Sequence, residues 1–293
     1  MTWLAVQIEI DAARVEAVEA ALLAIGALSI ELSDAGDEAI LEPAPGDTPL
    51  WRRIRLNALF EPTVDKIPIQ LALASATAPG PLPPNSFGLV ENEDWVARLR
   101  DELQPLRFGR DLWICPPGKP CPEPTGTVIT MEPGLAFGTG THQTTALCLD
   151  WLADRPVENR DVLDYGCGSG ILSIASLALG ARRVAAVDID PQAVRATRAN
   201  AGRNSGNERL AVVLPDELGH GQSFDILLAN LLSGTLIDLA PALRDHCHAG
   251  TTVALSGILT KQADSVTAAF GEWVDFDPPT RRDDWVLLTG IVT

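Results

Sequence analysis

Residues 162–170, VLDYGCGSG, place three glycines between an apolar run and an apolar segment that starts at Ile171. The run is typical of a strand, and the segment is typical of a helix. Gly166, Gly168 and Gly170 have no Cβ, and the first turn of a helix exposes N–H groups, so a small ligand can approach this backbone closely. The spacing is G-x-G-x-G, which departs from the G-x-G-x-x-G of nicotinamide dinucleotide sites. The turn therefore predicts a small-ligand site and speaks against a dehydrogenase.

Two aspartates follow the next apolar run, about twenty residues after the turn. Asp188 ends that run, where an acidic side chain can accept both hydroxyls of a ribose. Asp190 precedes Pro191, and proline is favoured at the first position of a helix, so Asp190 is assigned to helix capping. The alternative role of Asp188 is to cap the same helix. The glycine turn and Asp188 together predict an adenosine-type ligand.

Two further segments bring polar groups to the same edge of the predicted sheet. Asn230 ends the strand-like run DILLAN, and it is either a ligand contact or a plain turn residue. The glycine-threonine loop at 137–145 leads into a helix and contains Thr141, His142 and Thr145. These side chains suit a carboxylate or ammonium group, or else they only start a helix. Asn230 and His142 are candidates for the reacting site, and His142 can equally shape the loop.

The cysteines do not form a metal site or an obvious disulfide framework. The sequence His246-Cys247-His248 resembles metal ligands, but neighbouring side chains point apart and no second cluster is near in sequence, so no metal is predicted. The number of cysteines is odd, no Cys-x-x-Cys pair occurs, and the N-terminus does not resemble a signal peptide. These features favour a reduced, cytoplasmic setting for Cys115, Cys121, Cys148, Cys167 and Cys247.

The first 90 residues predict a small α+β domain. The order of its elements is β-α-β-β-α-β, which is the ferredoxin-like arrangement. Asp11 is expected to cap the first helix. The expected strands lie at 3–10, 27–32, 52–60 and 87–91, and the helices lie at about 14–24 and 63–74. A connector helix is expected over 91–106, where Trp95, Leu99 and Leu103 recur at helical spacing.

Residues 107–293 predict an α/β domain with a largely parallel, Rossmann-like sheet, because strand-like and helix-like segments alternate. A C-terminal hairpin of 273–277 and 285–290 closes the chain. The expected strands are 127–131, 161–166, 183–188, 210–214, 225–230 and 252–257, and the expected helices are about 144–153, 170–179, 191–201, 236–245 and 262–270.

Composition limits the partners. Of the 293 residues, 46% are hydrophobic and 21% are charged, which is the range of ordinary globular proteins. No apolar run reaches about 18 residues, so no membrane span is expected. The formal net charge of −17 disfavours direct nucleic-acid binding, because acidic side chains repel phosphates. It attracts a basic protein or a small cation, or it serves solubility alone.

The motifs resemble a known family. DYGCGSG followed by VDID and then by AN is similar to the S-adenosylmethionine site of class I methyltransferases. EPGLAFGTGTHQTT, together with NLLSGTL and LSGIL, resembles specifically the ribosomal protein L11 methyltransferases (PrmA). The resemblance covers essentially the whole chain, including LWICP at 112–116 and the closing segment 285–290. The competing classes are a nicotinamide-linked oxidoreductase and a non-catalytic binding module.

The resemblance implies a cofactor, a substrate and a set of contacts. The cofactor is S-adenosylmethionine, and the substrates are lysine side chains and the N-terminal amine of ribosomal protein L11, carried to the trimethylated state by an enzyme we expect to be a monomer. Residues 1–90 are expected to recognise that protein, and no general base is assigned. The family has proline at the positions of Gln143 and Thr235, and bulkier aromatics at Leu99 and Leu103. The implied cofactor contacts are Thr145, Gly166, Asp188 and Asn230, with Gly168, Gly170 and Thr141 beside them.

The sequence predicts that the chain binds S-adenosylmethionine and does not bind NAD. Replacing Asp188 with Ala should weaken binding by roughly 1.5 to 3 kcal/mol, because charge-assisted hydrogen bonds to the ribose are lost. Titration calorimetry with each ligand measures both effects. Unchanged affinity in folded Asp188→Ala protein would remove the ribose assignment.

Overall fold

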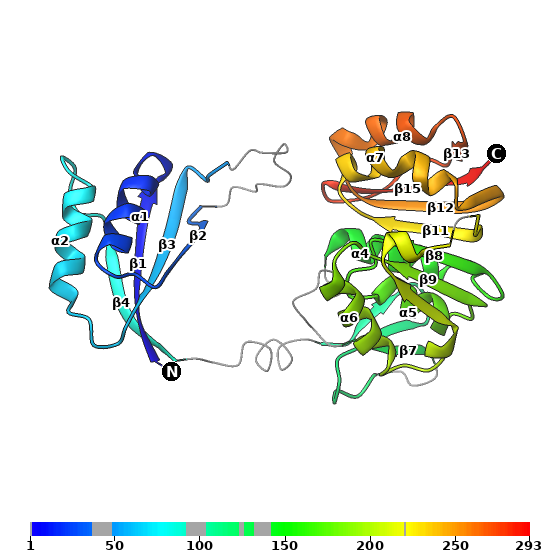
Figure 1. The fold of residues 1–293 in the computed structure, drawn as a ribbon, viewed down its shortest axis with the longest axis horizontal. Helices are drawn as coiled ribbons and strands as arrows, with labels where there is room; N and C mark the ends of the chain where they lie inside the picture. Colours follow the sequence, from blue (N-terminus) through cyan, green and yellow to red (C-terminus); the bar gives the residue numbers. More distant parts are fainter. Residues whose placement is uncertain (1, 37–48, 92–103, 123–125, 132–141, 220) are drawn as a thin grey trace. The chain divides into compact units, whose positions relative to one another are not determined.

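The computed structural model describes residues 2–36, 49–91, 104–122, 126–131, 142–219 and 221–293. The chain divides into two compact units, residues 1–94 and 95–293, and each has its own layers of helix and sheet (Figure 1). Within the described residues, no helix is both long and apolar enough to cross a membrane.

The first unit has the expected β-α-β-β-α-β order. Its elements are β1 (Thr2–Asp11), α1 (Val15–Ala24), β2 (Ser29–Asp34), β3 (Arg53–Phe60), α2 (Lys66–Ala76) and β4 (Asn85–Glu91). The sheet order is β2-β3-β1-β4, and all neighbouring strands are antiparallel. This is the ferredoxin-like arrangement, so the expected fold of this unit is confirmed.

Hydrophobic periodicity explains the core of the first unit. Strands β1 and β3 bury every second side chain, whereas α1 and α2 bury side chains three and four positions apart. Both helices therefore cover the same face of the sheet (Figure 1). The buried set is Leu4, Val6, Ile8, Ile10, Val15, Val18, Leu22, Ile54, Leu56, Ala58, Phe60, Ile69 and Leu73.

The expected cap of the first helix is wrong. Asp11 ends β1, and its side chain makes no capping hydrogen bond. A 3-10 turn over Ala12–Arg14 separates the strand from α1, so Asp11 stands too far from the helix amides. Helix α2 is capped as the chemistry requires, since the Asp65 carboxylate accepts from Ile67 N at 3.1 Å. That cap explains why α2 starts at Lys66 rather than at 63.

The second unit is built on one large, mostly parallel sheet. Its order is β10-β9-β8-β11-β12-β15-β13. The first five strands are mutually parallel, and β15 is antiparallel to β12, β13 and β14. The strands are β8 (Asp161–Tyr165), β9 (Arg183–Val187), β10 (Leu210–Val213), β11 (Phe224–Asn230), β12 (Cys247–Leu259), β13 (Val274–Phe276), β14 (Thr280–Arg282) and β15 (Trp285–Val292). The expected Rossmann-like sheet and C-terminal hairpin are confirmed.

Helices pack on both faces of this sheet (Figure 1). The strands are hydrophobic on both sides, and neighbouring residues of β8 illustrate it. Val162 belongs to the core cluster that contains residues of α4 (Gln143–Ala153) and α5 (Ile171–Ala178), whereas Leu163 belongs to the cluster that contains residues of α7 (Ser233–Arg244) and α8 (Ala263–Phe270). Helix α6 (Pro191–Ala201) follows β9 directly. This layering places all the strand-to-helix turns of the parallel strands at one edge.

The segment after residue 103 differs from the expectation. The strand expected at 127–131 is observed as β7 (Thr127–Thr130), but it lies in a separate three-stranded sheet with β5 (Leu106–Phe108) and β6 (Leu112–Cys115). Within the described residues, β7 pairs with β6 and not with a strand of the large sheet. The sequence could not predict this pairing, because an apolar run indicates a strand but does not specify its partner. Of the connector helix expected over 91–106, residues 92–103 lie outside the described residues, and its two ends belong to strands, Glu91 to β4 and Leu106 to β5.

One pair of cysteines is not reduced, which corrects the expectation of free thiols. Cys115 and Cys121 form a disulfide, with their Cα atoms 6.0 Å apart. Cys115 ends β6, and Lys119 N donates to Pro116 O at 3.2 Å in the turn that follows, so the chain folds back on itself. Cys148, Cys167 and Cys247 are free thiols.

The core of the first unit predicts a large penalty for losing its biggest side chain. Phe60→Ala should reduce the free energy of unfolding of this unit by about 3 to 5 kcal/mol, because Phe60 is completely buried and leaves a cavity. Urea denaturation measures it. Leu89→Ala, at a side chain that is 68% exposed, is the control and should change stability by less than about 0.5 kcal/mol.

Candidate functional site

A pocket opens at the carboxyl edge of the large sheet. Five of the residues predicted from the sequence lie in its wall: Thr145 from α4, Gly166 and Gly168 from the turn after β8, Asp188 after β9, and Asn230 at the end of β11. The rest of the wall is formed by Cys167, Ile171, Leu172 and Leu231. Segments separated by up to 86 positions therefore meet at one place, as parallel strand ends predict.

The glycine turn is joined to the end of β9. Gly166 N and Cys167 N both donate to Val187 O, at 2.7 and 3.0 Å. Gly166 has φ +83°, and a Cβ built there would collide with the Leu231 side chain, so only glycine fits. Because Leu231 also lines the pocket, the absence of a Cβ at Gly166 preserves the wall itself.

Asp188 and Asp190 play different roles. The Asp188 carboxylate accepts from Gly168 N through Oδ2 and from Asp190 N through Oδ1, each at 2.9 Å. Two backbone amides thus orient a half-buried carboxylate whose oxygens still have lone pairs for a ligand. Asp190 accepts from Gln192 N at 2.7 Å and caps α6, with Pro191 at the first helical position. The predicted capping role of Asp190 is confirmed.

Asn230 and Thr145 meet across the pocket floor. Asn230 Nδ2 donates to Thr145 Oγ1 at 3.2 Å, and Thr145 is only 1% exposed. This hydrogen bond fixes the orientation of the Asn230 amide. Its carbonyl oxygen, Oδ1, makes no hydrogen bond within the described part of the chain, so it is an acceptor available at the pocket.

Comparison with known proteins identifies the family. The model of the family described as ribosomal protein L11 methyltransferase (PrmA) matches residues 2–292. The chain belongs to the PrmA family. It is 47% identical to the ribosomal protein L11 methyltransferase of Pseudomonas aeruginosa over 291 residues, which cover 99% of this chain and 98% of that protein. It is 44% identical to the enzyme of that name from Shewanella piezotolerans, with 99% of both proteins covered.

A solved structure agrees with this family. The ribosomal protein L11 methylase of Lactobacillus delbrueckii subsp. bulgaricus superposes with a TM-score of 0.58 and 31% identity, covering 65% of this chain and 100% of that one. The resemblance inferred from the motifs is therefore confirmed. The chain is a methyltransferase of the PrmA family, which excludes the oxidoreductase and the non-catalytic binding module.

His142 starts α4 rather than lining the pocket. It is the N-cap residue, with Nδ1 2.8 Å from Thr144 Oγ1 and 3.4 Å from Thr144 N. Its ring packs edge-on against Trp285, with the centroids 5.1 Å apart. These contacts favour the interpretation that His142 shapes the start of the helix. They also explain how α4 begins at Gln143, where the PrmA pattern has proline.

The remaining candidate residues differ in whether they line the pocket. Gly168 lines the pocket, but Gly170 does not. Gly170 has φ +81°, and a Cβ there would lie 2.6 Å from Thr197 Cγ2, so its need for glycine comes from packing on α6. Thr141, Leu99 and Leu103 lie outside the described residues. Thr235 lies in the first turn of α7, so that helix begins without the proline of the PrmA pattern.

Asp164 is a buried acid beneath the site that the sequence reasoning missed. It is 1% exposed, and Ser173 Oγ of α5 donates to its Oδ2 at 2.6 Å. Burial raises the pKa of Asp164 to about 6, and the nearby Asp188 charge raises it further against the hydrogen bonds from Ser173. The available signal was an acid two residues before the first glycine of the turn. Asp164 and Ser173 join the strand to the helix on either side of that turn.

The cysteines near the pocket are not nucleophiles. Burial is the main cause that raises the pKa of the Cys148 thiol to about 12, and it also raises the pKa of Cys167. Both thiols therefore stay protonated at neutral pH. Cys167 lines the pocket only as a small apolar side chain.

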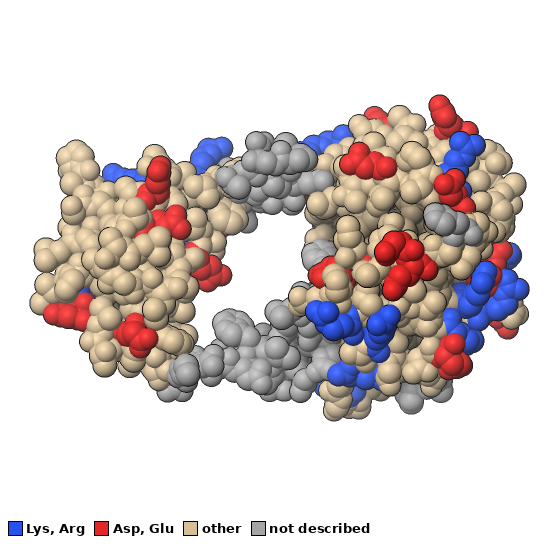
Figure 2. All heavy atoms as spheres, in the orientation of Figure 1, with Lys and Arg blue, Asp and Glu red and all other residues tan. Residues whose placement is uncertain are grey.

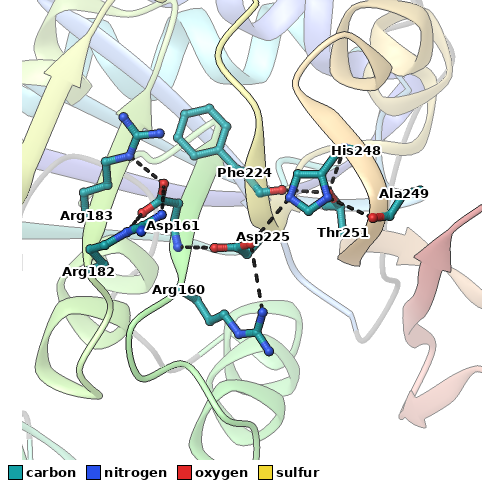
Figure 3. A network of polar contacts seen from close by, with 9 residues as sticks. All are labelled: Arg160, Asp161, Arg182, Arg183, Phe224, Asp225, His248, Ala249 and Thr251. Atoms are coloured by element: carbon teal, nitrogen blue, oxygen red, sulfur yellow. Dashed lines mark hydrogen bonds and ion pairs between the residues drawn. The ribbon is translucent and has the colours of Figure 1, made fainter.

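The opposite, amino edge of the sheet carries a structural network (Figure 3). Asp161, 4% exposed, accepts from Arg182 and Arg183, each at 2.7 Å, and its backbone N donates to Asp225 Oδ2 at 2.8 Å. His248 Nε2 lies 3.4 Å from Asp225 Oδ1.

The three residues that resemble metal ligands turn to different partners. His248 contacts Asp225, as above, whereas the His246 ring contacts Gln222 O at 3.0 Å. The Cys247 thiol donates to Leu243 O at 3.4 Å. The three side chains thus do not converge on one point, as expected for neighbours in the sequence.

The burial of Asp164 predicts a pH-dependent cost. A raised pKa means that its contribution to stability is complete below the unfolded value near 3.8 and is lost as the pH rises through about 6. Relative to wild type, Asp164→Asn should therefore gain about 2 kcal/mol of unfolding free energy between pH 4 and 7. Urea denaturation across this range measures the difference.

The control for this prediction is Asp161→Asn. Burial alone would raise the pKa of Asp161, but Arg182 and Arg183 hold it below its usual value. Its contribution is present above the unfolded pKa near 3.8 and is lost only as the pH falls below it. Relative to wild type, Asp161→Asn should therefore stay nearly constant between pH 4 and 7 and should show the opposite slope below pH 4. A pH-independent difference for Asp164→Asn would mean that Asp164 titrates normally.

Proposed function

We propose that this chain transfers methyl groups from S-adenosylmethionine to lysine side-chain amines and the N-terminal amine of ribosomal protein L11, to the trimethylated state. The observation that carries the proposal is the meeting of Thr145, Gly166, Asp188 and Asn230 around one pocket in a PrmA-family chain. The relatives of 44% and 47% identity are named for that substrate.

The pocket fits this cofactor. Asp188 offers an oriented carboxylate for the two ribose hydroxyls, and Gly166 and Gly168 leave a wall without side chains for close approach. Ile171 and Leu172 give an apolar surface at the start of α5, where exposed N–H groups favour a carboxylate. The pocket wall thus contains a carboxylate that can accept hydrogen bonds from two hydroxyls, a helix N-terminus that can bind an anion, and apolar side chains.

The difficult step of this reaction is the deprotonation of the amine that accepts the methyl group. S-adenosylmethionine supplies a methyl group on a positively charged sulfur, so the departing thioether is neutral and needs no acid. A lysine of pKa about 10.4 costs about 4.6 kcal/mol to deprotonate at pH 7, whereas an α-amino group near 7.8 costs about 1. Desolvation at an apolar wall lowers the pKa of an ammonium group.

Asn230 is the residue we assign to orienting the amine. Thr145 holds its Nδ2, and its Oδ1 is available to accept an N–H and aim the nitrogen lone pair. No general base is assigned, because His142 caps α4 and the thiols remain protonated. Each methylated amine is still a nucleophile until it becomes quaternary, so repeated transfer follows if the amine can rotate.

We further propose a division of labour. Residues 1–90 recognise the protein substrate, 91–106 connect, and 107–293 form the methyltransferase domain. Residues 1–90 carry 12 acidic and five basic side chains, a net charge of −7, which attracts a basic protein and repels phosphates. Acidic side chains are spread over the visible face of the first unit (Figure 2). The enzyme is expected to act as a monomer in the cytoplasm on free protein, without direct contact to nucleic acid or membrane.

Mass spectrometry of recombinant ribosomal protein L11 tests the proposal. Incubation with the enzyme and S-adenosylmethionine should add up to three methyl groups to individual amines, association should slow as salt rises, and added RNA should not compete. A product with a single methyl group at long times, or label in RNA, contradicts it. Asp188→Ala should lose most activity, whereas Asp264→Ala, an exposed acid on α8, should not.

A further inference from the structure

Helix α6 holds the glycine turn from the side away from the pocket. Thr197 Oγ1 donates to Gly168 O, and Asn200 Nδ2 donates to Ser169 O, each at 3.0 Å. Thr197 is completely buried and Asn200 is 5% exposed. The two side chains lie three positions apart and so share one face of the helix. Neither side chain lines the pocket.

Gly168 is held at both of its backbone polar atoms. Its N–H donates to the Asp188 carboxylate at 2.9 Å, and its carbonyl accepts from Thr197. Asp188 stands three residues before α6, and Thr197 lies within that helix. The same helix therefore positions both the acid that faces the ligand and the turn that forms the neighbouring wall.

Thr197 also supports the turn on either side of Gly168. Its Oγ1 lies 3.4 Å from Cys167 Sγ, and its Cγ2 occupies the space where a Cβ of Gly170 would stand. One threonine thus contacts three positions of a turn rich in glycine. Since glycine loses the most conformational freedom on ordering, these contacts restrict the turn before any ligand binds.

The far end of α6 is fixed as well. Asn204, just beyond the helix, accepts from Thr130 N at 2.8 Å and donates to Thr130 O at 2.9 Å. Its Nδ2 also donates to Asn200 O at 2.9 Å. Anchored to β7 in this way, α6 is a rigid support for the two side chains that hold the turn.

We propose that Thr197 and Asn200 are positioning residues for the cofactor: they hold the carbonyl oxygens of Gly168 and Ser169, so that the pocket wall is already in its binding shape. This inference rests on the proposed use of S-adenosylmethionine. Because a preformed wall saves ordering entropy on binding, these residues act on affinity and leave the methyl-transfer step alone.

The test is Thr197→Val, which keeps the shape of the side chain and removes its hydroxyl. Calorimetry should show S-adenosylmethionine and S-adenosylhomocysteine binding between roughly threefold and tenfold more weakly, as expected for one lost hydrogen bond. The KM for the cofactor should rise by the same factor, while kcat at saturating cofactor stays unchanged. Thr197→Ser, which keeps the hydroxyl and loses only Cγ2, should restore most of the affinity. Asn200→Ala should weaken binding over the same range as Thr197→Val.

Thr251→Val is the matched control. Thr251 is equally buried and donates through Oγ1 to Phe224 O at 2.6 Å, but it lies in the network at the opposite edge of the sheet (Figure 3). It should lower stability without changing cofactor affinity. The inference is overturned if Thr197→Val binds as wild type, if Ser does not restore affinity, or if Thr251→Val weakens binding equally. If the wild-type enzyme does not bind S-adenosylmethionine, the proposed function and this inference both fail.

Discussion

Two amide groups and one carbonyl connect the ends of neighbouring strands at the site. Gly166 N and Cys167 N donate to Val187 O, which brings the turn after β8 against the last residue of β9. The next residue, Asp188, can then reach Gly168 N with its carboxylate. Without this junction, the acid and the glycine turn would not share a wall, and α6 would have no turn to support. The requirement for glycine at 166 follows from the same geometry, since Leu231 occupies the space beside it.

The two edges of the sheet use polar groups differently. At the amino edge, Asp161 and Asp225 are satisfied by arginines, a histidine and backbone amides within the protein (Figure 3). At the carboxyl edge, Asp188 and Asn230 are oriented by the protein and still keep acceptor capacity toward the pocket. Acids paired with groups of the protein stabilise the fold, whereas oriented groups that keep acceptor capacity can receive a hydrogen bond from a ligand.

Strand β8 shows how the surroundings of two aspartates shift their pKa values in opposite directions. Asp161 at its start and Asp164 near its end are both buried. Two guanidinium groups hold the pKa of Asp161 low, whereas Asp164 accepts hydrogen bonds from Ser173 and burial raises its pKa to about 6. Asp164 lies next to the glycine turn at a cost in stability at neutral pH. Asp164 has a structural role there, because its hydrogen bond with Ser173 links β8 to α5 across that turn.

The sequence by itself determined the elements and their order, because hydrophobic periodicity, glycine turns and capping residues act over a few positions. It determined the two arrangements of strands and helices, the cap at Asp190, and the polar strand ends at Asp188 and Asn230. The sequence motifs also identified the PrmA family. Local signals were weaker at Asp11, where a 3-10 turn intervenes, and at β7, whose partner strand is chosen by packing.

Only the tertiary structure decided which distant groups meet. The hydrogen bonds of Thr197 and Asn200 to the turn span about thirty residues, and the disulfide of Cys115 depends on the path of a turn. The burial of Asp164, and with it the raised pKa, depends on packing against helices from other parts of the chain, among them α5, which supplies Ser173. Such contacts leave no periodic trace in the chain, because their energy depends on distance in space rather than on spacing along the sequence.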